Sequence, residues 1–386
     1  MLGVRKKMKI FQNILAQVGL DHYNADLIDA IEKTTSVDVE KALADKPGYN
    51  LRKLVALISP AAEKYLEQMA QKAQQITRQR FGNTIQLYAP LYVSNFCVNS
   101  CPYCAFNIKS KFTPSRLTIE QACKEADILA SEGFRHLLLV SGEDKKFVTT
   151  DYLSALAAEL RKKFSSISIE IYPVDQSNYE KLFASGIDSI ALYQETYDRD
   201  DYKKFHTAGP KADYDYRLQT LERAGNAGFR SLGLGFLIGL SDWRMQTLAL
   251  AEHAGFLMKK YWQSRVSFSF PRMRPAENVN QNMFRYMITD SQLVQMMAAL
   301  RLCFSDAEIV FSTRENAQFR DNVSKICITR MSAGSKTNPG GYADDFAVEQ
   351  FEVADDRSPA EVAAMLKSCG LEPVWKDWDI AFNSGF

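Results

Sequence analysis

The spacing of apolar and polar residues changes near residue 84. Before that point, apolar residues recur at helical spacing over residues 37–44 and 51–58, and again in a long stretch that begins at Ser59 and Pro60, a serine before a proline at the first helical position. After it, short β-rich runs alternate with amphipathic segments of about 12 to 16 residues. This alternation is typical of repeated strand–helix units that build a parallel sheet.

Seven or eight parallel strands are predicted. The candidates are residues 85–93, 136–141, 167–172, 189–193, 231–238, 265–270, 309–312 and, with a weaker pattern, 326–331. The helix after the first strand shows a capping-box pattern from Thr118 to Gln121, with Gly133 beyond its end. Further helices are predicted at 152–164, 178–185, 215–227, 243–258, 291–304 and 360–368.

These elements predict an α/β fold, a closed (βα)8 barrel of the TIM type. Residues 1–80 are expected to form an N-terminal helical extension, residues 81–335 the barrel, and residues 336–386 a C-terminal extension that packs on the barrel. In such barrels the chemistry takes place where strands end and loops begin, so the strand ends are where functional residues are expected.

Composition and charge narrow the class of protein. Hydrophobic residues make up 46% and charged residues 24%, as in ordinary globular proteins. The 47 Lys and Arg against 46 Asp and Glu give a net charge of +1, so no nucleic-acid partner is expected. No run reaches the ~18 consecutive apolar residues that a membrane span needs. Polar residues interrupt the apolar run near the N-terminus and no cleavage site follows, so a cytoplasmic protein is expected.

Three of the seven cysteines, Cys97, Cys101 and Cys104, share one short loop directly after the first predicted strand. The others fall in apolar patterns and are expected to be small buried side chains; they are Cys123, Cys303, Cys327 and Cys369. A structural zinc ion would want a fourth protein ligand, and the loop has no histidine near it. A 4Fe-4S cluster is normally held by four thiolates, so one held by three would leave an iron free to bind another group.

The triplet, with Tyr103 just before its last cysteine, closely resembles the cluster motif of the radical S-adenosylmethionine enzymes. The resemblance implies a 4Fe-4S cluster on Cys97, Cys101 and Cys104, with S-adenosylmethionine bound at the open iron. It also implies that residues at successive strand ends hold the rest of this cofactor. The matching positions here are Tyr103, Gly142, Glu143, Gln194, Glu195, Arg217 and Gly235.

The resemblance gives several of these positions a role. Gly142 would allow close backbone approach and Glu143 would receive the methionyl ammonium, although the pair also fits an ordinary strand-to-helix turn. Gln194 and Glu195 would accept hydrogen bonds from the ribose hydroxyls. Arg217 would pair with the methionyl carboxylate, unless it forms a surface ion pair.

Gly235 belongs to a run of glycines in the fifth predicted strand. Gly233 and Gly235 share one face and would leave room for a flat ligand against the backbone. With Gly239 they follow G-x-G-x-x-x-G inside a strand, whereas the dinucleotide-binding pattern is G-x-G-x-x-G at the start of a helix. Dinucleotide binding is therefore not expected.

The ends of the sixth and seventh predicted strands carry cations that suit an anionic substrate. Arg272 and Arg274 follow the sixth predicted strand, where two guanidinium groups can hold a carboxylate. Ser312 and Arg314 follow the seventh and add a hydroxyl and another cation, unless Arg314 pairs with its neighbour Glu315. We therefore expect an amino-acid substrate, with Arg272, Ser312 and Arg314 as catalytic residues and Arg274 as a weaker candidate.

Six segments along nearly the whole chain look like the aromatic amino-acid lyases among these enzymes, and most like the tyrosine lyases of thiamine biosynthesis. They are residues 89–95, 193–197, 269–272, 312–315, 340–344 and 375–378. Two positions depart from the pattern: Ser141 stands where threonine is common, and Asp198 where histidine is common. The second departure puts a proton-transfer role at that position in doubt.

Related lyases supply the alternatives. Tyrosine lyases of hydrogenase maturation carry a second cluster on a C-terminal extension, whereas only Cys369 lies near the end of this chain, so one cluster is expected. Tryptophan lyases of peptide-antibiotic pathways share similar motifs. A non-catalytic iron-sulfur electron-transfer protein is a further alternative, against which the paired arginines argue, because electron transfer needs no substrate clamp.

The resemblance implies a defined reaction. A reduced cluster would cleave S-adenosylmethionine to a 5'-deoxyadenosyl radical that takes a hydrogen atom from the tyrosine amine. The Cα–Cβ bond would then break to give 2-iminoacetate and, from the side chain, p-cresol. Thiazole synthase is the expected protein partner, and a flavodoxin or ferredoxin-type protein the expected reductant.

Overall fold

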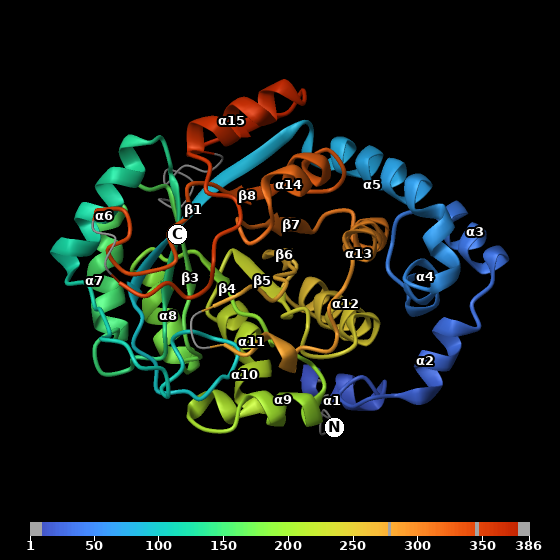
Figure 1. Cartoon of the computed structure of the whole chain (residues 1–386), viewed down its shortest axis with the longest axis horizontal. Helices are drawn as coiled ribbons and strands as arrows, with labels where there is room; N and C mark the ends of the chain where they lie inside the picture. The colour runs from blue at the N-terminus through green and yellow to red at the C-terminus, as the bar shows by residue number, and fades with distance from the viewer. Residues whose placement is uncertain (1–9, 277–278, 344–346, 377–386) are drawn as a thin grey trace, which may run out of the picture.

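The computed structural model describes residues 10–276, 279–343 and 347–376, and its centre is a closed barrel of parallel strands (Figure 1). The barrel strands are β1 (Thr84–Ser94), β2 (His136–Ser141), β3 (Ser166–Glu170), β4 (Ser189–Ala191), β5 (Ser231–Gly235), β6 (Arg265–Ser269), β7 (Glu308–Phe311) and β8 (Arg330–Ser332). They pair in chain order, and β1 pairs with both β8 and β2, which closes the barrel. The predicted (βα)8 architecture is confirmed.

The two faces of the strands differ in chemistry because side chains alternate along each strand. The faces that point outward carry apolar residues such as Ile169, Leu232 and Phe268, each almost fully buried beneath the surrounding helices. The faces that point to the barrel axis carry many small polar residues, and a narrow space inside the barrel is lined by Tyr88, Ser168, Ser189, Tyr193, Ser231, Ser267 and Ser269, among others. The interior is therefore polar as far as the strand ends.

Helices between the strands surround the barrel. They are α6 (Ile119–Ser131), α7 (Thr150–Leu160), α8 (Gln176–Ala184), α9 (Arg199–Phe205), α10 (Tyr214–Leu218), α11 (Thr220–Asn226), α12 (Trp243–Lys260), α13 (Asp290–Cys303), α14 (Ala317–Ser324) and α15 (Pro359–Ser368), with short 3-10 turns at Pro210–Ala212 and Gln281–Met283. The predicted capping box is present at the start of α6, where Thr118 and Gln121 each accept the other's backbone N–H. Among the described residues, no helix is long and apolar enough to cross a membrane.

Helices precede the barrel, and the first, fourth and fifth of them pack against α12 and α13 (Figure 1). They are α1 (Phe11–Gln17), α2 (Ala25–Glu32), α3 (Ser36–Ala44), α4 (Leu51–Leu57), a 3-10 turn (Pro60–Tyr65) and α5 (Leu66–Phe81). Gln295 of α13 donates two hydrogen bonds, to the carbonyls of Leu57 and Ser59, at 3.0 and 2.9 Å. Phe11 stacks on His253 of α12 with ring centroids 4.1 Å apart.

Several elements differ from the expectation. The helix predicted at 215–227 is broken at Gln219 into α10 and α11. The eighth strand begins later than predicted, because residues 325–327 form the turn that ends α14, and so the buried Cys327 lies in a turn and not in a strand. An additional short strand, β9 (Glu372–Val374), pairs with the first residues of β1. The short helices α1, α2, α9 and α14 were not predicted.

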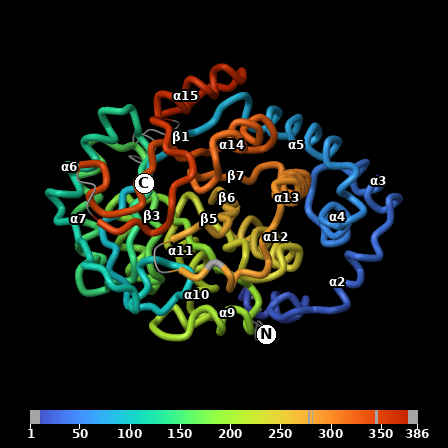
Figure 2. The backbone as a smooth tube through the Cα atoms, in the orientation of Figure 1, coloured from blue at the N-terminus to red at the C-terminus, as the bar shows by residue number. Residues whose placement is uncertain are grey.

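The segment that follows β8 returns across the end of the barrel and is called here the C-terminal strap (residues 347–358; orange to red in Figure 2). The backbone N–H groups of Ala354 and Asp355 donate to the carbonyl of Thr313, and that of Glu352 donates to the carbonyl of Pro275. These hydrogen bonds attach the strap to the loops that follow β6 and β7.

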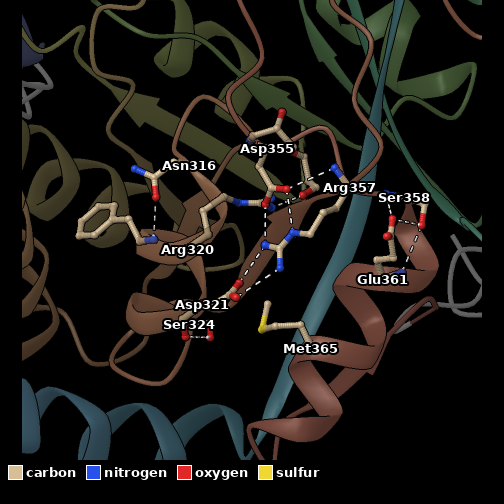
Figure 3. A network of polar contacts seen from close by, with 12 residues as sticks. Asn316, Arg320, Asp321, Ser324, Asp355, Arg357, Ser358, Glu361 and Met365 are labelled. Carbon is tan, nitrogen blue, oxygen red and sulfur yellow. Dashed lines mark hydrogen bonds and ion pairs between the residues drawn. The ribbon is translucent and has the colours of Figure 1, made fainter.

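Buried ion pairs secure the strap (Figure 3). The fully buried Arg320 of α14 pairs with the fully buried carboxylate of Asp355 and also donates to the carbonyl of Ser332 at the end of β8. Arg357 bridges Asp355 at 2.7 Å and Asp321 of α14 at 2.8 Å. A single network therefore joins the strap, α14 and β8.

Candidate active site

A cavity opens at the carboxyl ends of the barrel strands, which is where barrels of this kind carry their active sites. Most of the residues predicted to be functional line it: Cys97, Cys101, Tyr103, Cys104, Gly142, Glu143, Glu195, Arg217 and Arg314. Gln194, Gly235, Arg272 and Ser312 are not among its lining residues. The barrel thus gathers residues more than 200 positions apart in the chain around one space.

The three cysteines lie in the loop after β1, and N–H groups point at their sulfurs. The side chain of Asn99 and the backbone N–H of Glu143 both donate to Cys97 Sγ at 3.4 Å. The amide of Gln350, on the strap, lies 3.8 Å from Cys104 Sγ. Hydrogen bonds of this kind stabilise negative charge on sulfur and are typical around iron-sulfur clusters.

Burial makes two of these thiols, those of Cys101 and Cys104, reluctant to ionise in the protein alone. It raises the pKa of Cys101 to about 11 and that of Cys104 to about 12. Thiolates are the form that binds iron, so cluster binding must release these protons. Three thiols around one cavity, with N–H donors aimed at the sulfurs, fit a cluster held by three protein ligands.

Gly142 lies between the cysteine loop and the end of β2, and its lack of a side chain is required there. A Cβ at this position would lie 2.3 Å from the carbonyl oxygen of Phe96 and 3.1 Å from Cys97 Cβ. The Gly142 N–H donates to the carbonyl of Ser94, which fixes the approach. The buried side chain of Glu143 accepts a hydrogen bond from Asn99 at 2.7 Å and pairs with Lys145 at 3.0 Å.

We expect Gly142→Ala to displace the cysteine loop, because the added methyl group overlaps a backbone oxygen that has no room to retreat. Overpacking of this kind costs about 1 to 3 kcal/mol. The variant should therefore retain less iron after anaerobic reconstitution and bind S-adenosylmethionine more weakly, as measured by iron analysis and equilibrium binding.

Gly255→Ala is the matched control for this change. Gly255 lies inside helix α12, where a Cβ would lie 3.6 Å from the nearest atom of Tyr49, an ordinary contact. Alanine in a helix interior is favoured over glycine by up to about 1 kcal/mol. If Gly142→Ala held as much iron and cofactor as Gly255→Ala, the tight contact with Phe96 would not control the loop.

The end of β4 carries a buried charge cluster. Glu195 Oε1 pairs with Lys211 Nζ at 2.7 Å and with Arg217 Nη2 at 3.2 Å. Burial acts to raise the pKa of Glu195, but Lys211 and Arg217 outweigh it and the pKa is lowered, so this carboxylate is charged. Both contacts use one oxygen, so Oε2 is left to face a ligand.

The backbone at Glu195 is strained, with a φ of 71° in a residue that is not glycine. Arg217 donates from Nε to the carbonyl of Tyr193 at 2.9 Å, which holds its guanidinium under the cavity. This buried position excludes the surface ion pair that was the alternative for Arg217.

Gln194 and Gly235 were expected to contact the cofactor, but neither lines the cavity. Tyr193 and Glu195 line the cavity, whereas the side chain of Gln194 points the other way and donates to the carbonyl of Tyr214. Gly235 makes room for the protein itself, since a Cβ there would lie 2.3 Å from the carbonyl oxygen of Ser269 and 2.9 Å from the ring of Tyr193. A ligand-binding role for either residue is not supported.

Tyr103 is held by a histidine that stays neutral. Its hydroxyl lies 2.6 Å from His206 Nε2, and His206 Nδ1 lies 2.8 Å from the carbonyl oxygen of Tyr202. Because a carbonyl only accepts, Nδ1 carries the proton and the Tyr103 hydroxyl donates to Nε2. Burial lowers the pKa of His206 to about 3, which keeps the ring in this form.

Arg272 and Ser312 are not among the residues that line the cavity. Arg272 forms a forked pair with Glu315 and a second ion pair with Asp290 at 2.6 Å, so its guanidinium is already engaged outside the cavity. The Ser312 hydroxyl accepts the backbone N–H of Arg314 and shapes the turn after β7. Arg314 and Arg274 line the cavity instead, and Glu315 pairs with Arg272 and not with Arg314.

Among the cavity residues that escaped the sequence analysis are Asn99, Glu170, Lys211, Gln350 and Phe351. Asn99 stands within the cysteine motif, and its amide joins Cys97 to Glu143. Glu170 ends β3, so a search of every strand end for carboxylates would have found it. Lys211 and the strap residues carry no local signal, because distant parts of the chain bring them to the site.

Comparison with known proteins agrees with this geometry. Residues 91–251 match the model of the radical SAM superfamily, and residues 269–372 match the model of the biotin and thiamin synthesis associated domain. The structure resembles the crystal structure of HydG, a maturase of the FeFe-hydrogenase, with a TM-score of 0.87 and 33% identity; the match covers 95% of this chain and 82% of HydG.

Curated relatives match the chain over nearly its full length. The 2-iminoacetate synthases of Salmonella typhimurium and Escherichia coli are each 44% identical over 374 residues, which covers 96% of this chain and 97% of each relative. This identity, the cysteine motif and the closed barrel agree, and the chain belongs to the 2-iminoacetate synthase family of radical S-adenosylmethionine enzymes.

Proposed function

We propose that this chain is a tyrosine lyase, which cleaves the Cα–Cβ bond of tyrosine to give 2-iminoacetate for thiazole formation in thiamine biosynthesis and p-cresol as the second product. The observation that carries this proposal is the 44% identity to 2-iminoacetate synthases over nearly the whole length of both chains. A cavity lined by the cysteine loop on one side and by the cations Arg274 and Arg314 on the other supports it.

The cofactor half of the cavity is built from the cysteine loop and the ends of β2 and β4. Cys97, Cys101 and Cys104 would hold a 4Fe-4S cluster, which together with S-adenosylmethionine supplies a 5'-deoxyadenosyl radical when both are bound. Glu143 would accept from the methionyl ammonium, and Glu195 Oε2 from the ribose hydroxyls. Arg217 would pair with the methionyl carboxylate, and the ring of Tyr103 would border the bound cofactor.

The substrate half lies opposite, between the ends of β6 and β7 and the strap. Arg314 would bind the tyrosine carboxylate, with Arg274 as a second cation. The ring of Phe351 lies 3.3 Å from the Arg314 guanidinium carbon and orients that side chain. Gln350 accepts a hydrogen bond from Tyr92 at 2.7 Å, so the strap closes this side of the cavity and shields the reaction from water.

Partners follow from the proposed reaction. Thiazole synthase would take up 2-iminoacetate, which hydrolyses in water, and a flavodoxin or ferredoxin-type protein would reduce the cluster. A cytoplasmic location is part of the same proposal, because reduced iron-sulfur chemistry of this kind needs a reducing compartment.

Product analysis tests the function directly. Reconstituted enzyme with S-adenosylmethionine, a reductant and tyrosine, under anaerobic conditions, should release p-cresol, 5'-deoxyadenosine and glyoxylate, the last from hydrolysis of 2-iminoacetate. Phenylalanine should be a poorer substrate, because a cavity partner of the phenol hydroxyl would be left unpaired. Chromatography with mass detection measures all three products.

Tryptophan serves as the competing substrate in the same assay. An indole product from tryptophan together with no p-cresol from tyrosine would overturn the proposal in favour of a tryptophan lyase. Absence of any product from both, with an intact cluster and intact S-adenosylmethionine binding, would favour a non-catalytic iron-sulfur protein.

A further inference from the structure

Two oppositely charged side chains face the active-site cavity without a partner. Glu170 ends β3 and Arg314 follows β7, and both line the cavity. Within the described ranges, neither carboxylate nor guanidinium makes a hydrogen bond or an ion pair, and Arg314 has only its contact with the ring of Phe351. A partly buried charge without a partner is costly, so such a pair points to a ligand that carries the complementary charges.

The position of Glu170 follows from strand alternation. Ser168 lines the space inside the barrel, so Glu170, two residues further along β3, points to the same axis at the mouth. Burial is the main cause that raises the pKa of Tyr88, Tyr92 and Tyr193, and the carboxylate of Glu170 raises the pKa of each further. Glu170 therefore stands on the floor of the cavity, above the polar interior of the barrel.

Other carboxylates at the cavity are already engaged. Glu195 pairs with Lys211 and Arg217, and Glu143 is held by Asn99 and Lys145. Of the carboxylates that line the cavity in the described part of the chain, only Glu170 has neither a hydrogen bond nor an ion pair, and the other two are assigned above to S-adenosylmethionine.

A free amino acid carries a carboxylate and an ammonium group on one carbon. The proposed reaction, on which this inference rests, takes a hydrogen atom from the nitrogen, and a nitrogen-centred radical is far easier to form from a neutral amine than from an ammonium ion. The enzyme therefore needs a group that binds the ammonium and removes one proton from it.

We propose that Glu170 is this group: it binds the ammonium of the substrate amino acid while Arg314 binds the carboxylate, and it accepts one ammonium proton. In this step one N–H bond breaks and one O–H bond forms, which leaves a neutral amine beside a neutral carboxylic acid. No electron moves, and the total charge of the pair is unchanged.

The acidity of Glu170 suits this exchange. Burial raises its pKa to about 7 and nearby Glu195 contributes, while Arg314, Arg217 and Lys211 act in the opposite direction. An acid with a pKa near the working pH both binds a cation as the carboxylate and keeps a proton once it has accepted one. Glu195, with its lowered pKa, is a far weaker base.

Binding of tyrosine and two truncated analogues tests the assignment. One analogue, 3-(4-hydroxyphenyl)propanoate, lacks the amine, and the other, tyramine, lacks the carboxylate. Dissociation constants are measured with the reconstituted enzyme and S-adenosylmethionine but without reductant, so that no turnover occurs. The variants are Glu170→Gln and Arg314→Gln, each checked for iron content and melting temperature.

Glu170→Gln should reduce the preference for tyrosine over 3-(4-hydroxyphenyl)propanoate about tenfold, because one charge-assisted hydrogen bond is lost. Its preference for tyrosine over tyramine should stay unchanged. In Arg314→Gln the preference for tyrosine over tyramine should fall, and the preference for tyrosine over 3-(4-hydroxyphenyl)propanoate should stay unchanged. Equal weakening of the binding of all three ligands would indicate a general structural defect and would overturn the assignment. An unchanged preference of Glu170→Gln for tyrosine over 3-(4-hydroxyphenyl)propanoate would also overturn it.

The pH profile tests the proton step separately. In Glu170→Gln, p-cresol formation should be slow near neutral pH and should rise as the pH approaches the pKa of the substrate amine, because solution then supplies the neutral amine. The wild-type rate should change far less over this range. A parallel loss at every pH would show that Glu170 accepts no proton, whereas wild-type p-cresol formation still reports on the proposed function.

Discussion

Replacing Cys97, Cys101 or Cys104 by alanine should abolish cluster binding and all product formation. Each thiol lines the same cavity in the loop after β1. A cluster that has only three protein ligands cannot lose one and remain bound, so the expected effect is near-complete loss. After anaerobic reconstitution the wild type should hold about four iron and four sulfide per chain, and each variant should hold little of either.

Cys123→Ala and Cys369→Ala are the matched controls. Cys123 lies in α6 and Cys369 caps α15, and neither lines the cavity. Both variants should keep the iron content and the absorbance of the wild type. Loss of the cluster in either control, or its retention in a variant of the loop cysteines, would show that the ligands have been assigned wrongly.

The sequence predicted best those features that depend on neighbouring residues, such as strands and helix caps. The second strand was predicted over the residues that form β2, and the capping box at Thr118 was found from spacing alone. Strand ends were found in the same way, and the resemblance to the radical S-adenosylmethionine enzymes then implied roles for the cysteine loop, Gly142 and Glu195 at those ends. Both faces of the barrel strands are largely buried, so short apolar runs between turn residues mark them in the sequence.

The predicted site residues that do not line the cavity are those whose side-chain direction could not be predicted from the sequence. Arg272 and Arg314 both follow a strand, but Arg272 turns to the acidic pair Glu315 and Asp290, which no local pattern reveals. Gln194 follows β4 and its side chain bonds the carbonyl of Tyr214, and the φ of 71° at Glu195 shows that the backbone departs there from the extended conformation. Gln350 reaches Tyr92 across 258 positions of sequence, a contact that needs the complete fold.

Asp355→Asn should lower the free energy of unfolding by about 3 to 5 kcal/mol, because it leaves the fully buried Arg320 without its anionic partner. Arg357 loses a partner as well, and retains Asp321. The strap should then loosen from α14, and the affinity for tyrosine should fall with it, since Phe351 orients Arg314. Denaturant unfolding and tyrosine binding measure the two effects.

Asp29→Asn is the control for the removal of one carboxylate from an ion pair. Asp29 pairs with Lys33 on an exposed face of α2 at 2.6 Å, and exposed pairs contribute about 0 to 1 kcal/mol. If Asp355→Asn destabilised the protein no more than Asp29→Asn does, the buried network would not be what secures the strap.

The strap also sets the order in which the active site is completed during synthesis. The cysteine loop emerges from the ribosome with the first strand, whereas Gln350, Phe351 and Asp355 emerge only after all eight barrel strands. The three thiols of the cysteine loop are therefore synthesised well before the strap residues that close the barrel mouth.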